Sequence, residues 1–255
     1  MKSNKLSFIL SLASCIFLLA SIFTNPVFSQ ENQVSMSIFT EIQLKPGMED
    51  EFEKFMKDEV IPAMKQGGQQ EMSVWKTAVF GGGATYVLTS PVTALKQFDS
   101  PHPVVNAVGP YGARAMWAKM VNYSESVKSF MMWGVPDLEI APPEGYSQKL
   151  GFQVKVTVAP GQDKKYEKDS KIIKAVLQKT KVKGFYTGRV GLGGNPNQYY
   201  FLVLVDSFAD MQAWGMAWEK AASETKMPEM TGVVNNIEYS MYAYDPGLSI
   251  QPQAQ

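Results

Sequence analysis

The chain has 255 residues, with 24 basic and 24 acidic side chains, one histidine and one cysteine. It lacks the basic excess that holds nucleic-acid phosphates, so we do not expect nucleic acid as a partner. The length is sufficient for one large hydrophobic core or two small ones without disulfide bonds.

The first residues have the pattern of a secretory signal peptide. Lys2 and Lys5 form a positive region, residues 6–23 are mostly apolar, and Val27-Phe28-Ser29 offers a cleavage site. We predict that residues 1–29 are removed on export and that the mature protein is periplasmic or secreted, without stable membrane association. A retained anchor is the alternative, because the apolar run is long enough to span a bilayer.

The only cysteine, Cys15, lies inside this segment. Leu12-Ala13-Ser14-Cys15 resembles a lipobox, so lipidation is a further alternative, although the chain stays apolar after Cys15 where lipoproteins turn polar. Cleavage after Ser29 would leave no cysteine, which rules out a disulfide, a thiol nucleophile and a cysteine metal site in the mature chain. Loss of the two leading lysines would give that chain a net charge of −2.

The rest of the chain contains an internal repeat with an offset of 114 residues. Residues 42–47 end in Lys-Pro-Gly and residues 156–161 end in Ala-Pro-Gly, and each run precedes a helical segment. The fifth residue of each segment is aromatic, Phe52 or Tyr166, and Glu-Lys follows it. This offset is too long for a solenoid and indicates a duplicated small domain.

Both copies predict the same order of elements, βαββαβ, which is the ferredoxin-like unit. In the first copy we expect a strand over 36–44, a helix that Pro62 kinks or ends, a hairpin of 74–80 and 85–88, a short helix over 92–98 and a strand over 127–133. In the second copy we expect a strand over 152–158, a helix after Gly161, a hairpin of 185–192 and 199–205, a helix over 208–222 and a strand over 237–244.

These elements define the predicted domains. The first ferredoxin-like domain covers residues 30–135, a linker rich in proline and glycine covers 136–147, and the second domain covers 148–245. Residues 246–255 are polar and are predicted to be a disordered tail.

A strand, a Lys-Pro-Gly turn and an acidic amphipathic helix within a βαββαβ unit resemble the dimeric α/β-barrel superfamily. The first copy resembles NIPSNAP-type and antibiotic-biosynthesis-monooxygenase-type domains, and the resemblance covers residues 35–133 and 150–244. It implies that two sheets pack face to face into a barrel, here within one molecule. We predict no cofactor. Haem is the alternative that the resemblance implies, because haem enzymes, some with tandem domains, occur in this superfamily.

The two apolar strand faces lead to the same architecture. The first strand of each copy has an apolar stripe, Met36, Ile38, Ile42 and Leu44 or Phe152, Val154, Val156 and Val158. The helices of a ferredoxin-like unit cover one face of its sheet, and the other face must find a partner or expose a large apolar patch. Pairing between two molecules, which would give a dimer or larger ring, is the alternative.

The residues that we test for catalysis are His102, Asn106 and Arg114. His102 is the only histidine and lies between two prolines, and a neutral imidazole can act as a base or ligand near neutral pH. A lone histidine is weak evidence for a metal site, and we predict none. The tandem haem relatives keep their ligand in the second half, where this chain has no histidine, so the resemblance argues against His102 as a haem ligand.

Aromatic residues are the candidates for ligand binding. The longer segment after His102 contains Tyr111 and Trp117, and Trp214 and Trp218 share a helix face. Trp75 aligns loosely with Phe185 or Tyr186 in the other copy. Such residues usually belong to a core, but around a cavity they would hold a planar apolar ligand.

The sequence contains no catalytic motif of high specificity. Residues 191–195 are rich in glycine, but they lie between two strands and lack the helix N-terminus of a phosphate-binding loop.

The leading hypothesis is an exported protein that binds a small, largely apolar ligand in or beside an α/β barrel. The alternative is an oxygenase-like or haem-handling enzyme of the same superfamily.

Overall fold

The computed structural model describes residues 35–79 and 83–252. The chain divides into Met1–Gln33 and a compact unit, Val34–Gln255, and all the described residues belong to the second unit. The predicted signal peptide and Cys15 therefore lie outside the described residues. None of the helices within the described residues has the length and apolar character that a bilayer span requires.

The described unit contains the expected duplication. The first half consists of β1 (Met36–Leu44), α2 (Glu49–Phe55), the π-helical turn η1 (Met56–Val60), α3 (Ile61–Gln66), β2 (Ser73–Thr77), β3 (Thr85–Val92), the 3₁₀ turn η2 (Leu95–Asp99), α4 (Pro103–Tyr123) and β4 (Ser124–Gly134). After the 3₁₀ turn η3 (Pro136–Leu138), the second half consists of β5 (Leu150–Val158), α5 (Asp163–Lys179), β6 (Gly184–Val190), β7 (Gln198–Val205), α6 (Phe208–Ser223) and β8 (Val234–Tyr244).

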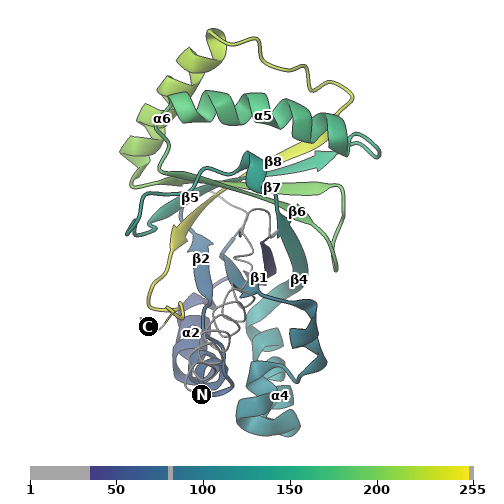
Figure 1. The fold of residues 1–255 in the computed structure, drawn as a ribbon. Helices are drawn as coiled ribbons and strands as arrows, with labels where there is room; N and C mark the ends of the chain where they lie inside the picture. Colours follow the sequence, from purple (N-terminus) through teal and green to yellow (C-terminus); the bar gives the residue numbers. More distant parts are fainter. Residues whose placement is uncertain (1–34, 80–82, 253–255) are drawn as a thin grey trace, which may run out of the picture. The chain divides into compact units, whose positions relative to one another are not determined.

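The eight strands form one closed antiparallel barrel in the order β1-β3-β2-β8-β5-β7-β6-β4. The halves join at two seams: β2 pairs with β8, where Trp75 lies opposite Tyr244, and β4 pairs with β6, where Gly134 lies opposite Gly188. The helices α2 and α4 lie on one side of the strands, and α5 and α6 lie on the opposite side (Figure 1). The predicted fold, two ferredoxin-like units paired as an intramolecular α/β barrel, is confirmed.

Side chains along each strand alternate between the helix-covered face and the barrel interior. On β5, Val156 and Val158 pack in the core beneath the helices, whereas Gln153 lines a cavity inside the barrel. On β1, Ile42 and Leu44 likewise face the helices. The apolar stripes that suggested pairing therefore pack against helices, and the residues of opposite parity meet across the barrel.

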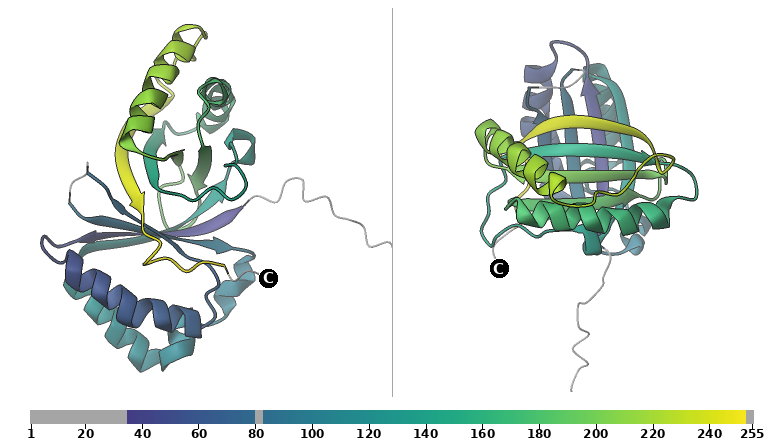
Figure 2. Two further views of the ribbon diagram at one scale, coloured as in Figure 1. Left: turned by 90° about the vertical axis from the view of Figure 1, so that its left-hand side faces the viewer. Right: turned by 90° about the horizontal axis from the view of Figure 1, so that it is seen from above.

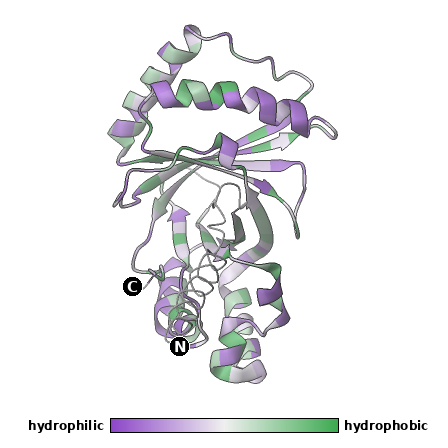
Figure 3. Ribbon diagram, in the orientation of Figure 1, coloured by the Kyte–Doolittle hydropathy of each residue, from purple (hydrophilic) through white to green (hydrophobic). Residues whose placement is uncertain are grey.

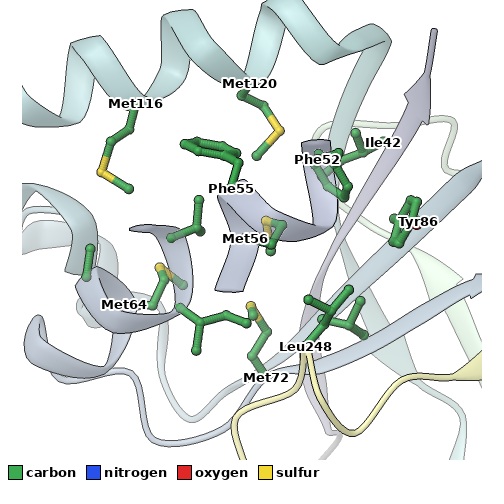
Figure 4. Packing of buried hydrophobic residues seen from close by; sticks show 14 of the residues in the cluster. Ile42, Phe52, Phe55, Met56, Met64, Met72, Tyr86, Met116, Met120 and Leu248 are labelled. Carbon is green, nitrogen blue, oxygen red and sulfur yellow. The ribbon is translucent and has the colours of Figure 1, made fainter. Parts of the chain in front are cut away.

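The first half has a filled core between its helices and its sheet. Figure 4 shows Phe55 of α2 beside Met116 and Met120 of α4, whereas Phe52 lies beside Tyr86 of the sheet, with ring centroids 4.7 Å apart. Phe52 and Met56 are fully buried. This core holds the first pair of helices close to the sheet. Figure 3 shows apolar as well as polar residues along α4, and Trp117 and Val121 of this helix are exposed.

The helix does not end at Pro62, and α3 continues to Gln66. The π-helical turn Met56–Val60 shifts the hydrogen-bond register just before the proline. Pro62 consequently lies in the first turn of α3, where its missing N–H is not needed.

The short helix predicted over 92–98 is wrong. β3 extends to Val92 because it pairs with β1 along its whole length, and only the 3₁₀ turn Leu95–Asp99 follows. The second helix of the first half is α4, which occupies the longer segment after His102. Gly109 is non-helical, with φ of 71°, and Pro110 follows it, so the sequence pattern of a helix is interrupted there.

The disordered tail is also wrong for residues 246–252. Leu248 is fully buried in the core of the first half, and Ile250 forms a β-bridge with Met72. Ser249 Oγ accepts a hydrogen bond of 2.9 Å from the backbone N–H of Val74. These three residues are apolar or small within a polar segment, and the sequence alone did not reveal their partners.

Candidate functional site

A cavity of about 310 Å³, the apolar cavity, lies between the helices and the sheet of the second half. Its size is at the lower end of the range for small-molecule sites. It is lined by Phe152, Val154, Val156, Tyr166, Ile173, Leu177, Phe185, Phe201, Val203, Trp214, Trp218, Met230, Val234, Ile237 and Tyr239. Figure 2 shows α5 and α6 lying over the strands that form its floor.

The apolar cavity exists because α6 packs loosely. Only Ala221 of α6 is buried, whereas α4, its counterpart in the first half, buries Val104, Ala113, Met116 and Met120. In the first half, methionine and phenylalanine side chains fill the space between helix and sheet (Figure 4). The duplication thus gives one half with a filled core and one half with room for a ligand.

Aromatic rings form the walls of the apolar cavity. Phe152 stacks on Tyr239, with ring centroids 5.7 Å apart and planes 10° from parallel. Trp214 lies 5.9 Å from Phe152 and 6.5 Å from Trp218, centroid to centroid. The Nε1–H of Trp214 is buried and has no hydrogen-bond acceptor within the described part of the chain. A buried donor without an acceptor is costly, and an acceptor on a ligand would relieve that cost.

The lining of the apolar cavity is uncharged. It contains no Asp, Glu, Lys, Arg or His side chain. Burial raises the pKa of the Tyr166 phenol well above its ordinary value, so Tyr166 stays neutral at physiological pH. The site is therefore suited to a neutral, flat ligand with at most one hydrogen-bond acceptor.

A second cavity of about 420 Å³, the barrel cavity, lies among residues on the inner side of the strands. It is more polar than the apolar cavity. Its lining consists of Ser35, Ser37, Phe39, Glu71, Ser73, Trp75, Val87, Thr89, Met132, Gly134, Glu139, Gln148, Gln153, Tyr186, Thr187, Gly188, Tyr200, Phe201, Leu202 and Tyr242.

The structure separates the aromatic residues that the sequence suggested for ligand binding. Trp214 and Trp218 line the apolar cavity, and Trp75 and Tyr186 line the barrel cavity. Tyr111 and Trp117 lie on α4 with 86% and 45% of their surface exposed, and neither lines one of these cavities. The contact of these residues with a ligand stays a prediction.

The three residues suggested for catalysis all lie at or on α4, outside both cavities. His102 is the N-cap, and its Nδ1 accepts a hydrogen bond of 3.2 Å from the Val104 N–H. The partial burial of its ring lowers the pKa of His102 below its ordinary value of 6.5, so it is neutral at pH 7. Asn106 donates to the Pro101 carbonyl at 3.3 Å, and Arg114 is exposed.

The residues around the apolar cavity do not fit a histidine-ligated haem. His102, the only histidine of the chain, belongs to the other half. The lining also offers no lysine or arginine that would pair with an acidic side group of such a cofactor. Among the described residues, no group of three or more His, Cys, Asp or Glu side chains is arranged to hold a metal ion.

Sequence reasoning missed most of the cavity wall. Phe152 and Val154 were assigned to an apolar strand face, and Tyr166 marked the repeat, but neither pattern revealed a cavity. The relevant signal is in α6, where small residues and glycine alternate with two tryptophans and bury little surface. Glu139 was treated as part of the linker, although it lines the barrel cavity.

No family model and no curated protein matches the chain. Solved structures do match its fold. A putative monooxygenase from Fusobacterium nucleatum is 12% identical, with a TM-score of 0.58 over 87% of this chain and 95% of its own. An anthrone oxidase-like protein is 10% identical, with a TM-score of 0.56 over 84% and 92%.

A chlorite dismutase variant from Candidatus Nitrospira defluvii is 8% identical, with a TM-score of 0.52 over 85% of this chain and 93% of its own. The matches extend over most of both chains, so they include both halves. At these identities they establish the architecture and not the chemistry. The closed eight-stranded barrel and these neighbours show that the chain has the fold of the dimeric α/β-barrel superfamily.

Proposed function

We propose that this is an exported protein that binds a small, flat, largely apolar ligand in the apolar cavity. The observation that carries the proposal is the difference between the two halves. The same βαββαβ unit is filled by side chains in the first half and encloses about 310 Å³ in the second. Export is proposed from the pattern of residues 1–29 alone.

The chemistry of the cavity supports a neutral aromatic ligand. Its walls are aromatic and branched aliphatic side chains, which stabilise a planar ring by burial and by stacking. The free Trp214 Nε1–H can donate to one carbonyl or hydroxyl oxygen of that ligand. A charged ligand would lose its hydration without gaining a counterion, so it is disfavoured.

The proposal is tested with the neutral fluorescent probe N-phenyl-1-naphthylamine and the mature chain. We expect a saturable rise in probe fluorescence, because the probe leaves water for an apolar site. Val154→Phe places extra bulk in the cavity from β5 and should weaken binding about tenfold, which corresponds to about 1.4 kcal/mol. Native mass spectrometry of protein purified from its host should show a bound mass.

Val121→Phe is the matched control, because Val121 is 63% exposed on α4 and lies outside the cavity. It should bind the probe as the unmodified protein does. Equal weakening by both substitutions, or binding that does not saturate, would show that the probe only coats exposed apolar surface and would refute the proposal.

Oxidation of such a ligand is the second candidate function. It is favoured by a flat aromatic cavity in a fold whose neighbours include a putative monooxygenase and an anthrone oxidase-like protein. The same preparations separate the two candidates when dioxygen is followed with an electrode in the presence of an anthrone. A binding protein leaves the dioxygen concentration unchanged, whereas an oxygenase-like enzyme consumes dioxygen and Val154→Phe reduces the rate.

A further inference from the structure

The barrel cavity is distinct from the apolar cavity in position and in chemistry. It lies on the opposite side of the sheet, and its walls combine aromatic rings, hydroxyl groups and two carboxylates. Trp75, Tyr186 and Tyr242 supply rings, and Glu71 and Glu139 supply the carboxylates. The apolar-ligand site proposed above does not use any of these side chains.

Two glycines of this lining lie opposite each other at the seam between the halves. Gly134 of β4 lies opposite Gly188 of β6, and both line the cavity. A Cβ atom on Gly134 would clash with Oγ of Ser35 and lie 3.3 Å from Oε1 of Glu139, so the absence of a side chain lets both residues approach β4 closely. A Cβ atom on Gly188 would lie 3.1 Å from the Met132 side chain. The seam therefore brings Glu139, from the connection between the halves, into the barrel lining.

The negative charge of the lining has no counterion there. The lining contains no Lys, Arg or His, and neither Glu71 nor Glu139 has a salt bridge within the described residues. Burial raises the pKa of Glu139, while the backbone of Thr187 and the charge of Lys174 oppose the shift. A cation in the cavity would stabilise both carboxylates.

The aromatic rings favour the same kind of ligand. The faces of tryptophan and tyrosine attract a cation that lies within about 6 Å of the ring centre. Trp75 is held edge-on by Tyr244, with centroids 5.3 Å apart, and is 5% exposed, so its orientation is fixed. The hydroxyl groups of Ser37, Ser73 and Thr89 lie in the same lining, and their oxygen atoms can accept a hydrogen bond from a hydroxyl or N–H group of a cationic ligand.

We propose that the barrel cavity binds a small organic cation that carries an ammonium group, held between the carboxylates of Glu71 and Glu139 and the aromatic side chains of Trp75, Tyr186 and Tyr242. A neutral polyol such as a sugar would match the rings and hydroxyl groups. It would leave both carboxylates without a counterion, and the charge of the lining therefore selects the cation.

Isothermal titration of the mature chain with choline tests the proposal. Its neutral isostere, 3,3-dimethylbutan-1-ol, and glucose are titrated in parallel. We expect choline to bind at least about tenfold more tightly than the isostere, because only the charge differs. Glu139→Gln and Glu71→Gln should each weaken choline binding about tenfold while preserving the shape of the cavity.

Glu51→Gln is the matched control, because Glu51 is an exposed carboxylate on α2 outside the lining. Choline affinity should not change in this variant. The proposal is overturned if choline gives no binding heat, if glucose or the neutral isostere binds as tightly, or if the Gln variants at 139 and 71 bind choline unchanged. Val154→Phe should not alter choline binding, so failure here and failure of the apolar-ligand proposal are distinguishable.

Discussion

At the scale of single residues, Glu53 connects the first helix to the strands. Its carboxylate accepts hydrogen bonds of 3.0 Å from Lys76 and Tyr86 and one of 3.3 Å from Lys57. Lys76 also forms an ion pair of 3.1 Å with Asp245, which follows β8. Burial raises the pKa of Glu53, but these hydrogen bonds outweigh it and leave the pKa below its ordinary value of 4.5.

This depressed pKa gives a prediction for acid stability. A carboxyl group with a lowered pKa in the folded state stabilises the protein above pH 4.5, and the contribution is lost as pH falls through the folded value. Glu53→Gln should reduce the free energy of unfolding by about 1–2 kcal/mol at neutral pH. Urea titrations should show a smaller difference from the unmodified protein at a pH well below 4.5. A difference of equal size at both pH values, or an equal loss in Glu51→Gln, would contradict this role of Glu53.

At the scale of elements, the C-terminal segment, residues 246–252, connects the two halves. It follows β8 of the second half and packs in the core of the first. Leu248 is fully buried there, and Ser249 and Ile250 bond to β2 and to Met72 beside it. The segment thus completes a core that the first copy does not fill alone.

Leu248→Ala should therefore destabilise the protein by about 2–5 kcal/mol, the usual cost of a large-to-small change in a filled core. Thermal unfolding followed by circular dichroism gives the measurement. Leu192→Ala serves as the control, because Leu192 is 56% exposed and should lose little. If both substitutions lower the melting temperature equally, the buried tail does not contribute to this core.

At the scale of the whole barrel, each half depends on the other. The two seams pair β2 with β8 and β4 with β6, and they leave the sheets without free edges between the halves. The inner residues Trp75 and Tyr242 pack in one cluster that draws on both halves. A separated half would expose both these side chains and the backbone groups of two strand edges.

Expression of residues 30–140 and 146–255 as separate chains tests this dependence. We expect the fragments to aggregate or to be poorly folded alone, and to associate when mixed, as judged by circular dichroism and sedimentation. Two soluble monomers that each unfold cooperatively and do not bind each other would disprove the interdependence.

The resemblance to a known superfamily predicted the barrel, and the sequence itself determined the duplication and the order of elements. These follow from local chemistry: the Pro-Gly turns, the alternation on β5 and the periodicity of the first helix are properties of neighbouring residues. The same local reasoning failed at Val92 and at the tail, where pairing with β1 and burial beside Met72 decided the structure. Such contacts join residues far apart in the chain, and no local pattern records them.

Only the tertiary structure decided which residues form the candidate sites. Whether Trp214 fills a core or lines a cavity depends on how far α6 lies from the sheet, and that distance results from the packing of the whole half. Glu139 lies in the barrel lining beside Gly134, at the β4–β6 seam whose register is set by closure of the barrel. The sequence specifies residue types and periodicities, whereas cavities arise from volumes left between elements, which are fixed only when the barrel is closed.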